Sequence, residues 1–396
     1  MELTFQAGTL LVLVAAVVAI ACRRLRLPYS VGLVATGIVL AFLPHLPRLE
    51  LTRELLFTAL LPPLLFEAAF HLPWKTLRRD ALPIFLLVSL GVLLSAAVTA
   101  GGLSLLLGWP LLPALVFGAL IAATDPVSVI AIFREAKATG RLLLLIEAES
   151  LFNDATAAVL FAAVLAMATG ASLGPLAACG LLLKSVAGGV LCGAAVAAGA
   201  LLLAGRTEDH LVEIALTAVA AYGSFSLADQ LGFSGVLATI ACGMTMGNLG
   251  PLRILTRRGQ AAITEFWEVA AFLANSLIFL LIGIHEAGQN YRGMGRLIAL
   301  GLAITLFGRA AAVYPCCALF TWSKLRIPWR QQHVLFWGGL RGALALALAL
   351  SLPATLACRE QMLTLCFAVV AFSIFVQGLT MKPFLKKMKE ISASSF

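Results

Sequence analysis

Residues 119–133 read ALIAATDPVSVIAIF, an apolar run that Thr124, Asp125 and Pro126 interrupt near its middle. Proline has no backbone N–H, and its ring clashes with the carbonyl group four residues earlier. The residue before a proline is also pushed away from helical geometry. The sequence therefore predicts a helix that unwinds at residues 124–126. Inside a membrane, such a break is tolerated only where it faces protein or a water-filled cavity, and its free oxygens can bind a desolvated cation.

The whole chain has the composition of a membrane protein. Of its 396 residues, 61% are apolar and 12% are charged, whereas soluble domains average about 45–50% and about 25%. This composition excludes a disordered chain and leaves too little polar surface for a water-soluble globule. A spanning helix needs about 20 apolar residues, so the apolar ranges predict an all-α polytopic membrane protein of about thirteen transmembrane helices. The ranges are 5–22, 29–45, 52–71, 82–107, 111–133, 141–168, 175–204, 210–231, 233–249, 261–284, 296–320, 331–352 and 360–381.

Lys and Arg are unevenly distributed between the predicted loops. The loops after odd-numbered ranges and the C-terminal end hold 20 of the 28, and the loops after even-numbered ranges hold 5. Because cytoplasmic loops are enriched in Lys and Arg, we expect the N-terminus outside and the C-terminus in the cytoplasm. The same asymmetry explains the net charge of +9 without a nucleic-acid partner. The eight cysteines have no CxxC or Cys/His spacing, and we interpret them as small apolar residues.

The sixth range contains a second polar stretch, LIEAESLFNDATAAVLF at residues 145–161. Ser150 and Asp154 are four residues apart and share one stripe of the predicted helix. Glu149 and Asn153 share a second stripe, rotated by about 100°. One stripe can therefore face a cation pocket while the other braces a neighbouring helix. Burial penalises the charged form of a carboxyl group, so we expect Asp154 to exchange a proton for a metal ion.

The third polar stretch is FWGGLRGALALALALSLP at residues 336–353, where three glycines surround Arg341. Glycine weakens a helix and permits close backbone approach. An arginine in a membrane keeps its charge and needs a carboxylate, and we expect Glu149 to be that partner. Ranges five and twelve are seven crossings apart and therefore run in opposite directions. Two broken helices in opposite orientations are typical of transporters built from inverted repeats, with the site at the midplane.

Other ionisable residues lie within the ranges but outside these three stretches. Glu67 lies in LPPLLFEAAF. The sequence allows two roles for it: a water-linked support for the cation site, or a solvated residue at a helix end. Glu268 and Arg309 are expected to make bracing contacts. Lys184, near the start of range seven, is interpreted as an interfacial lysine whose charged end reaches water.

At these residues the sequence resembles the monovalent cation:proton antiporters of the NhaP/NHE type. The resemblance covers nearly the whole membrane domain, and it implies thirteen spans, inverted repeats with two crossing broken helices, a homodimer and elevator-like alternating access. It implies one transmembrane domain at 1–381, with a core bundle at about 82–168 and 296–381, a scaffold and dimerisation bundle at about 1–71 and 175–284, and a short basic cytoplasmic tail at 382–396. The motifs that carry it are LPPLLFEAAF, the TDP step, ESLFNDA, LGFSGVLA, FWEVAAFLANSLIFLLIG and FWGGLRGALALA.

The resemblance also implies roles for individual residues. Asp125 and Asp154 look like the cation-binding carboxylates, with Thr124 and Ser150 as oxygen ligands of the transported ion. Glu67 matches an acidic residue that reaches the ion through water. Glu149 with Arg341 looks like the buried ion pair of the family. Asn153 with Asp154 looks like the Asn-Asp form of its electroneutral exchangers.

The resulting prediction is a transporter, not an enzyme, that exchanges Na⁺ or Li⁺ for H⁺ across the cell membrane without a cofactor. Its expected partners are the cation, the proton, the lipid bilayer and a second copy of the chain. Two alternatives are an antiporter of the same fold that prefers K⁺ and a cation channel, which would need no proton coupling. An intramembrane serine protease is the other alternative, because residues 232–235 fit GxSG, but the five histidines all fall in loops or at span ends.

Overall fold

The computed structural model describes residues 2–25, 27–43, 51–136, 140–170, 175–250, 254–289 and 291–390. Within these ranges every regular element is helical and no strand occurs, as the apolar ranges predict. Some of the basic residues in the charge count lie outside the described ranges, namely Arg26, Arg48, Lys137 and Arg253. The side chain of Cys179 is also outside the description, and the other seven cysteines are free thiols.

The helices follow the predicted apolar ranges along the whole chain. The first half contains α1 (Glu2–Leu25), α2 (Tyr29–Ala41), α3 (Leu61–Phe70), α4 (Trp74–Leu77), α5 (Ala81–Leu86), α6 (Val92–Leu107), α7 (Leu111–Ala122), α8 (Val127–Glu135) and α9 (Arg141–Ala168). The second half contains α10 (Pro175–Ala204), α11 (His210–Gln230), α12 (Gly235–Leu249), α13 (Arg257–Ala287), α14 (Gly295–Ala318), α15 (Trp329–Trp337), α16 (Ala343–Leu350), α17 (Arg359–Phe372) and α18 (Leu379–Met388). Three π-helical segments continue directly into α3, α6 and α18, namely Leu55–Leu60, Leu87–Gly91 and Ser373–Gly378.

Length and composition make this chain a multi-pass membrane protein. Eight of the described helical stretches are long and apolar enough to cross a bilayer unaided. The other predicted ranges coincide with shorter helices or with pairs of helices separated by a short break. The figure of thirteen crossings stays a prediction. The last helix continues to Met388, so much of the predicted tail from residue 382 is helical, and residues 391–396 lie outside the description.

The turn between α11 and α12 explains the GxSG motif without catalysis. Gly232 has a φ of 72°, a left-handed conformation that glycine adopts without strain. Two residues later, the Ser234 hydroxyl accepts a hydrogen bond from the Leu237 amide at 3.2 Å and caps α12. Serine is favoured at this position because it satisfies a free N–H of the first turn. The predicted break between ranges eight and nine is confirmed, and Ser234 is a helix cap.

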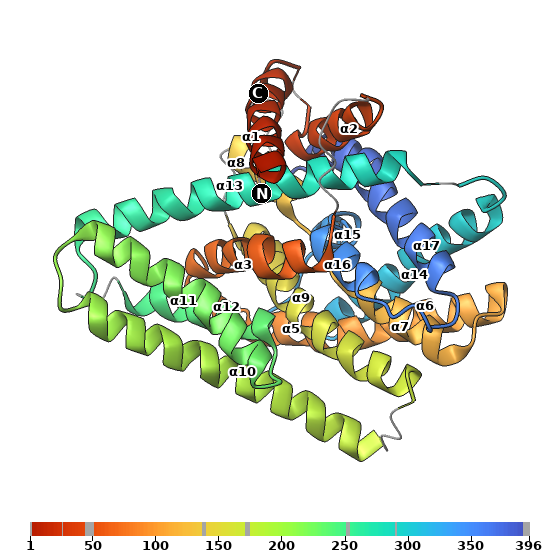
Figure 1. Cartoon of the computed structure of the whole chain (residues 1–396). Helices are drawn as coiled ribbons and strands as arrows, with labels where there is room; N and C mark the ends of the chain where they lie inside the picture. Colours follow the sequence, from red (N-terminus) through yellow and green to blue (C-terminus); the bar gives the residue numbers. More distant parts are fainter. Residues whose placement is uncertain are drawn as a thin grey trace.

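The helices pack into two groups that meet along a common boundary. In one group, α6 packs on α7 and α14, α9 on α7, and α17 on α14. In the other, α12 packs on α3, α10 and α11, and the long helix α13 packs on α2 and α3. Figure 1 shows α10, α11 and α12 on one side of the molecule and α6, α7, α14 and α17 on the other. The assignment of these groups as transport and dimerisation bundles stays a prediction.

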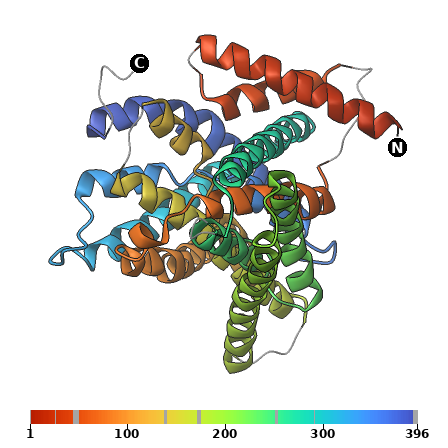
Figure 2. The same ribbon diagram turned by 90° about the vertical axis from the view of Figure 1, so that its left-hand side faces the viewer.

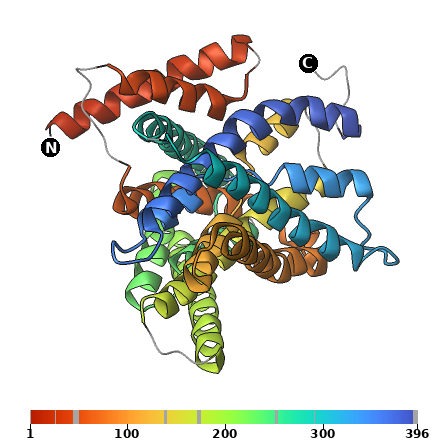
Figure 3. The same cartoon turned by 90° about the vertical axis from the view of Figure 1, so that its right-hand side faces the viewer.

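The first two helices form a layer on one edge of the molecule. Figures 2 and 3 both show α1 and α2 side by side along this edge, with α13 directly beneath them. The Tyr29 ring of α2 stacks on Phe272 of α13 with ring centroids 5.4 Å apart. At Gly37 the backbones come so close that a Cβ atom would overlap Gly283 and its neighbours in α13. Small residues at such crossings let membrane helices approach closely.

Candidate functional site

The first helix break is located at the predicted position. Helix α7 ends at Ala122 and α8 begins at Val127, and residues 123–126 are not helical. The Asp125 amide donates to the carbonyl oxygen of Leu340 at 2.8 Å. Its carboxylate accepts from the Val127 amide at 3.0 Å, at the start of α8. A carboxylate at a helix N-terminus is stabilised by the unpaired N–H groups there, so Asp125 belongs to the break itself.

The second break crosses the first. Helix α15 ends at Trp337 and α16 begins at Ala343, so the three glycines and Arg341 lie in the interruption. Backbone contact with the first break is close, because a Cβ atom at Gly342 would overlap the Asp125 carboxylate. Only glycine leaves this space. The predicted pair of crossing broken helices is therefore present in the fold.

Arg341 does not bind the carboxylate that we expected. Its guanidinium donates to the carbonyl oxygens of Ala122 and Ala123 at 2.9 Å each. These are the acceptors that the unwound step frees at the C-terminal end of α7, where a cation also complements the helix dipole. Arg341 is 3% exposed, and its hydrogen bonds fix one broken helix to the other.

The predicted pair of Glu149 with Arg341 is wrong, since Glu149 binds Arg309. The Arg309 guanidinium donates to both carboxylate oxygens of Glu149 at 2.7 and 3.1 Å and to the Leu335 carbonyl oxygen at 2.8 Å. Both side chains are buried. Two parallel N–H···O bonds give the geometry in which Arg and carboxylate match best. Sequence places Arg309 at the correct depth but does not say which way α14 is rotated, and that rotation decides the pairing.

Asn153 connects the ion pair to the first break. Its side-chain amide donates to the Thr124 hydroxyl at 2.8 Å and to Glu149 at 3.0 Å, and its carbonyl oxygen accepts from the Thr124 amide at 3.1 Å. The Ser150 hydroxyl donates to the Thr124 carbonyl oxygen. Glu149 and Asn153 therefore face neighbouring helices, while Ser150 faces the break. The two stripes of α9 have the separate orientations that their spacing predicts.

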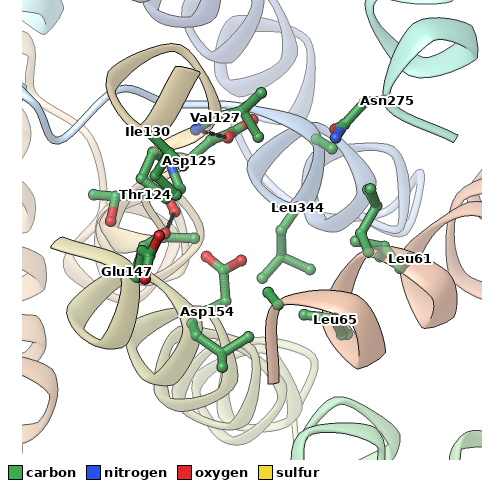
Figure 4. Close-up of a pocket in the computed structure, with 18 of the residues that line it drawn as sticks. Leu61, Leu65, Thr124, Asp125, Val127, Ile130, Glu147, Asp154, Asn275 and Leu344 are labelled. Carbon is green, nitrogen blue, oxygen red and sulfur yellow. Dashed lines mark hydrogen bonds between the residues drawn. The ribbon is translucent and has the colours of Figure 1, made fainter. Parts of the chain in front are cut away.

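The remaining stripe of α9 faces a cavity of about 280 Å³. The predicted ligands Thr124, Asp125, Ser150 and Asp154 all line it, and Glu67 of α3 lies in the same wall as Leu64 and Ala68. Figure 4 shows Asp154 pointing into the space, with Thr124 and Asp125 on one side and Leu61 and Leu65 on the other.

Asp154 is held less tightly than its neighbours. Its Oδ1 atom is sealed from solvent and has no hydrogen-bond partner in the described part of the chain. Asp125 lines the same cavity, and two carboxylates that share a site disfavour each other's charged form. A buried polar atom without a partner is costly. The cavity therefore offers a site where a cation or a proton would satisfy this carboxylate.

Three other polar residues in the lining were not predicted as site residues: His71, Glu147 and Asn275. Glu147 precedes Ser150 by three residues and Asp154 by seven, so the helical spacing itself could have identified it. Glu67 and His71 also contact each other, with the His71 ring nitrogen 3.5 Å from the Glu67 carboxylate. Glu268, expected to brace a neighbour, is exposed on α13. No group of three His, Cys, Asp or Glu residues in the described ranges could hold a metal ion.

Comparison with known proteins identifies the class to which this fold and site belong. The chain matches the family described as "Sodium/hydrogen exchanger, transmembrane" over residues 10–387. It is 38% identical to the Na⁺/H⁺ antiporter ApNhaP of Aphanothece halophytica over 365 residues, which are 92% of this chain and 70% of that protein. It is 36% identical to the Na⁺/H⁺ antiporter NhaH of Halobacillus aidingensis over 394 residues, 96% of each. This chain therefore belongs to the sodium/hydrogen exchanger family, and it is a transporter rather than an enzyme.

The fold has a counterpart among solved structures. The sodium proton antiporter MjNhaP1 from Methanocaldococcus jannaschii superposes with a TM-score of 0.74 and covers 98% of this chain and 96% of its own. The sequence identity is 20%, so the similarity concerns the fold. The all-helical fold of this chain therefore matches that of a solved antiporter structure.

Proposed function

We propose that this protein exchanges Na⁺ or Li⁺ for protons, with cation and proton competing for one site formed by Asp154 and Asp125. The observation that carries the proposal is the unpaired, buried Asp154 oxygen in a cavity at the crossing of two helix breaks. Family membership and the names of the two relatives above support the same activity.

The proposed ligands are hard oxygen atoms, which suit a small hard cation. Asp154 and Asp125 supply carboxylates, Ser150 supplies its hydroxyl, and Thr124 supplies an oxygen at the unwound step. All of them line the cavity. Glu67 lies on the opposite helix and would reach the ion through water.

The charges near the site favour one-for-one exchange. Glu149 and Arg309 neutralise each other in a direct pair. Arg341, which is bonded to the Ala122 and Ala123 carbonyl oxygens beside Asp125, offsets one of the two aspartate charges. With both aspartates ionised, the groups at the crossing of the two breaks keep one negative charge, which either one Na⁺ or one H⁺ neutralises. Asn153 adds no charge. We therefore propose electroneutral transport.

The position of the cavity supports alternating access. Asp125 lies in the first break and Asp154 on α9, whereas Glu67 and Asn275 lie on α3 and α13 of the other helix group. Movement of one group along the other would carry the occupied site across the membrane. An empty site would retain an uncompensated buried charge, which is costly in a low-dielectric environment, so exchange would be favoured over leak. We propose that two copies assemble through the α1–α3 and α10–α13 group.

The basic loops give the proposed orientation. We place the protein in the cell membrane with the N-terminus outside and the C-terminus in the cytoplasm, because Lys and Arg gather in the loops after odd-numbered ranges. The cavity then opens toward the cytoplasm, because its lining includes Glu67 and His71 near the end of α3, the cytoplasmic end of range three.

The test uses the full-length protein in vesicles that contain a pH-sensitive dye. Sodium, lithium, potassium and calcium are added in turn at several pH values, with protein-free vesicles as the control. Sodium or lithium should move protons, and calcium should not. Proton movement with potassium alone would overturn the choice of ion, and no movement with any cation would overturn the proposed function.

A further inference from the structure

Glu147 is a carboxylate in the cavity wall to which no role has been assigned above. It shares the stripe of α9 that carries Ser150 and Asp154, because the spacings are three and seven residues. All three residues line the cavity. Glu149 is only two residues away but points to the opposite side, where Arg309 binds it and it is 3% exposed. Glu147 is only partly buried. The two glutamates therefore face different environments.

Glu147 lies nearer than Asp154 to the end of the cavity at the start of α9. A helix rises 1.5 Å per residue, so the seven residues between them correspond to roughly 10 Å along α9. Glu147 is on the side of the helix start, where Arg141 forms an ion pair with Asp80 at 2.7 Å. Arg141 also donates to the carbonyl oxygens of Leu325 and Arg326 at 2.7 Å each. This end of α9 is therefore anchored among basic loops, on the proposed cytoplasmic side.

The wall opposite Glu147 also carries polar groups. Glu67 and His71 lie near the end of α3 and line the same cavity. The lining residues that α8 contributes are Val127, Ile130 and Ala131, which are apolar. Among the residues that line the cavity, Glu147 and Glu67 are thus the acidic ones that lie between the helix ends and the two aspartates.

A cation that approaches from this side meets an electrostatic obstacle. The loops around the opening are rich in Lys and Arg, and a positive potential lowers the local concentration of cations. The apolar side chains that α8 contributes add the cost of removing water from the ion. A carboxylate in a low-dielectric wall offsets both effects, because such walls focus the field of a single charge.

We propose that Glu147 is a staging site that binds the entering cation on the cytoplasmic side before the cation moves to Asp154 and Asp125. This inference depends on the proposed function and on the proposed orientation. Glu147 would hold a partly hydrated ion, and Asp154 would take the ion after more of its water has been lost. Glu147 thereby determines how well the cytoplasmic opening captures a cation, while Asp154 determines whether exchange occurs at all.

The experiment compares Glu147→Gln with the wild type in everted membrane vesicles, whose cytoplasmic face is outward. The variant should raise the KM for external Na⁺ roughly three- to tenfold, the size of a single partly screened charge interaction. Its Vmax should stay within about twofold of the wild type, because Asp154 is intact. Glu147→Asp should restore most of the affinity. Glu208→Gln is the matched control, since Glu208 is an exposed loop carboxylate that does not line the cavity.

Sidedness separates the staging role from a general loss of affinity. In right-side-out vesicles, Glu147→Gln should leave the KM for external Na⁺ unchanged. An unchanged KM in everted vesicles, or a lower Vmax with no change in KM, would overturn the staging site while leaving the exchange activity in place. An effect confined to right-side-out vesicles would overturn its cytoplasmic position. Inactive wild-type vesicles would instead contradict the proposed function itself.

Discussion

Adjacent residues on α9 have opposite environments. Asn153 makes three hydrogen bonds that connect Thr124 with Glu149, and it is 1% exposed. Asp154 points into the cavity, and one of its oxygens has no hydrogen-bond partner among the described residues. A side chain whose hydrogen bonds are complete has little to gain from a ligand, whereas an unpaired buried oxygen has much to gain. This difference supports our proposal that Asp154 binds the transported species.

Asp154→Asn should abolish cation-dependent proton movement in reconstituted vesicles. The amide keeps the size of the side chain but carries neither the negative charge nor the exchangeable proton. Folding should be retained, which size-exclusion chromatography in detergent would check. Asp229→Asn, a change at an exposed position of α11, should behave like the wild type. Normal exchange by Asp154→Asn would remove the central assignment.

Breaking the ion pair of Glu149 with Arg309 should mainly lower the stability of the folded protein rather than its cation affinity. Removing one partner leaves the other charge buried, at a cost of about 3–5 kcal/mol in the free energy of unfolding. Glu149→Gln and Arg309→Gln should therefore both lower the thermal unfolding temperature and the yield of monodisperse protein. Arg206→Gln, which changes an exposed arginine, is the control. A stable variant of either residue with a selectively weaker cation affinity would show that the pair belongs to the transport site.

At the scale of elements, the site depends on how closely the two breaks approach. Asp125 donates from its amide to Leu340, and Arg341 donates to the last carbonyls of α7. Each break thus satisfies backbone groups that the other leaves free, which is the condition for irregular backbone inside a membrane. The contact also leaves no room for a side chain at Gly342.

Gly342→Ala should lower the exchange rate by roughly tenfold or more, because the added methyl group displaces the Asp125 carboxylate, and small misplacements at a site have large effects. Gly199→Ala is the matched control, since nothing lies within 4 Å of a Cβ atom at Gly199 in α10. Alanine is favoured over glycine in a helix by about 1 kcal/mol, so the control should be active and slightly more stable. Initial rates in dye-loaded vesicles would compare the two. Wild-type rates for Gly342→Ala would show that the crossing tolerates movement.

At the scale of the whole molecule, the cavity lies where the two helix groups meet. The residues that line it come from α3 and α13 in one group and from the first break, α8, α9 and α16 in the other. The charged groups behind it are neutralised within one group, because Glu149 and Arg309 lie on α9 and α14. That group can therefore move as a unit without separating a buried pair.

The electroneutral exchange that we propose depends on this whole arrangement of charges. Clamping the membrane potential of vesicles with potassium and valinomycin should leave the initial rate of sodium-driven proton movement unchanged, within about twofold, at 0 and at 100 mV. A net charge of one carried across 100 mV is worth about 2.3 kcal/mol, which would change the rate strongly. Transport that follows the potential would contradict the one-for-one stoichiometry.

The sequence by itself determined the elements of this protein and the positions of its interruptions. Apolar runs long enough to span a bilayer can only be helical, because lipid offers no partner for an unpaired backbone group. A proline after Asp125 and three glycines around Arg341 break two of these helices for local reasons. The two stripes of α9 follow from the 3.6-residue period alone.

Only the tertiary structure decided which charges meet. Arg309 and Arg341 lie at comparable places in apolar segments, and nothing in either segment says which of them faces Glu149. The rotation of α14 places Arg309 against Glu149, and the carbonyls freed at Ala122 and Ala123 bind Arg341. The same holds for Glu147. Its spacing places it on the stripe of Asp154, but only the packing of α3 and α8 around that stripe forms the cavity that Glu147 lines. Pairing between distant segments depends on how whole helices pack, and no local pattern records that.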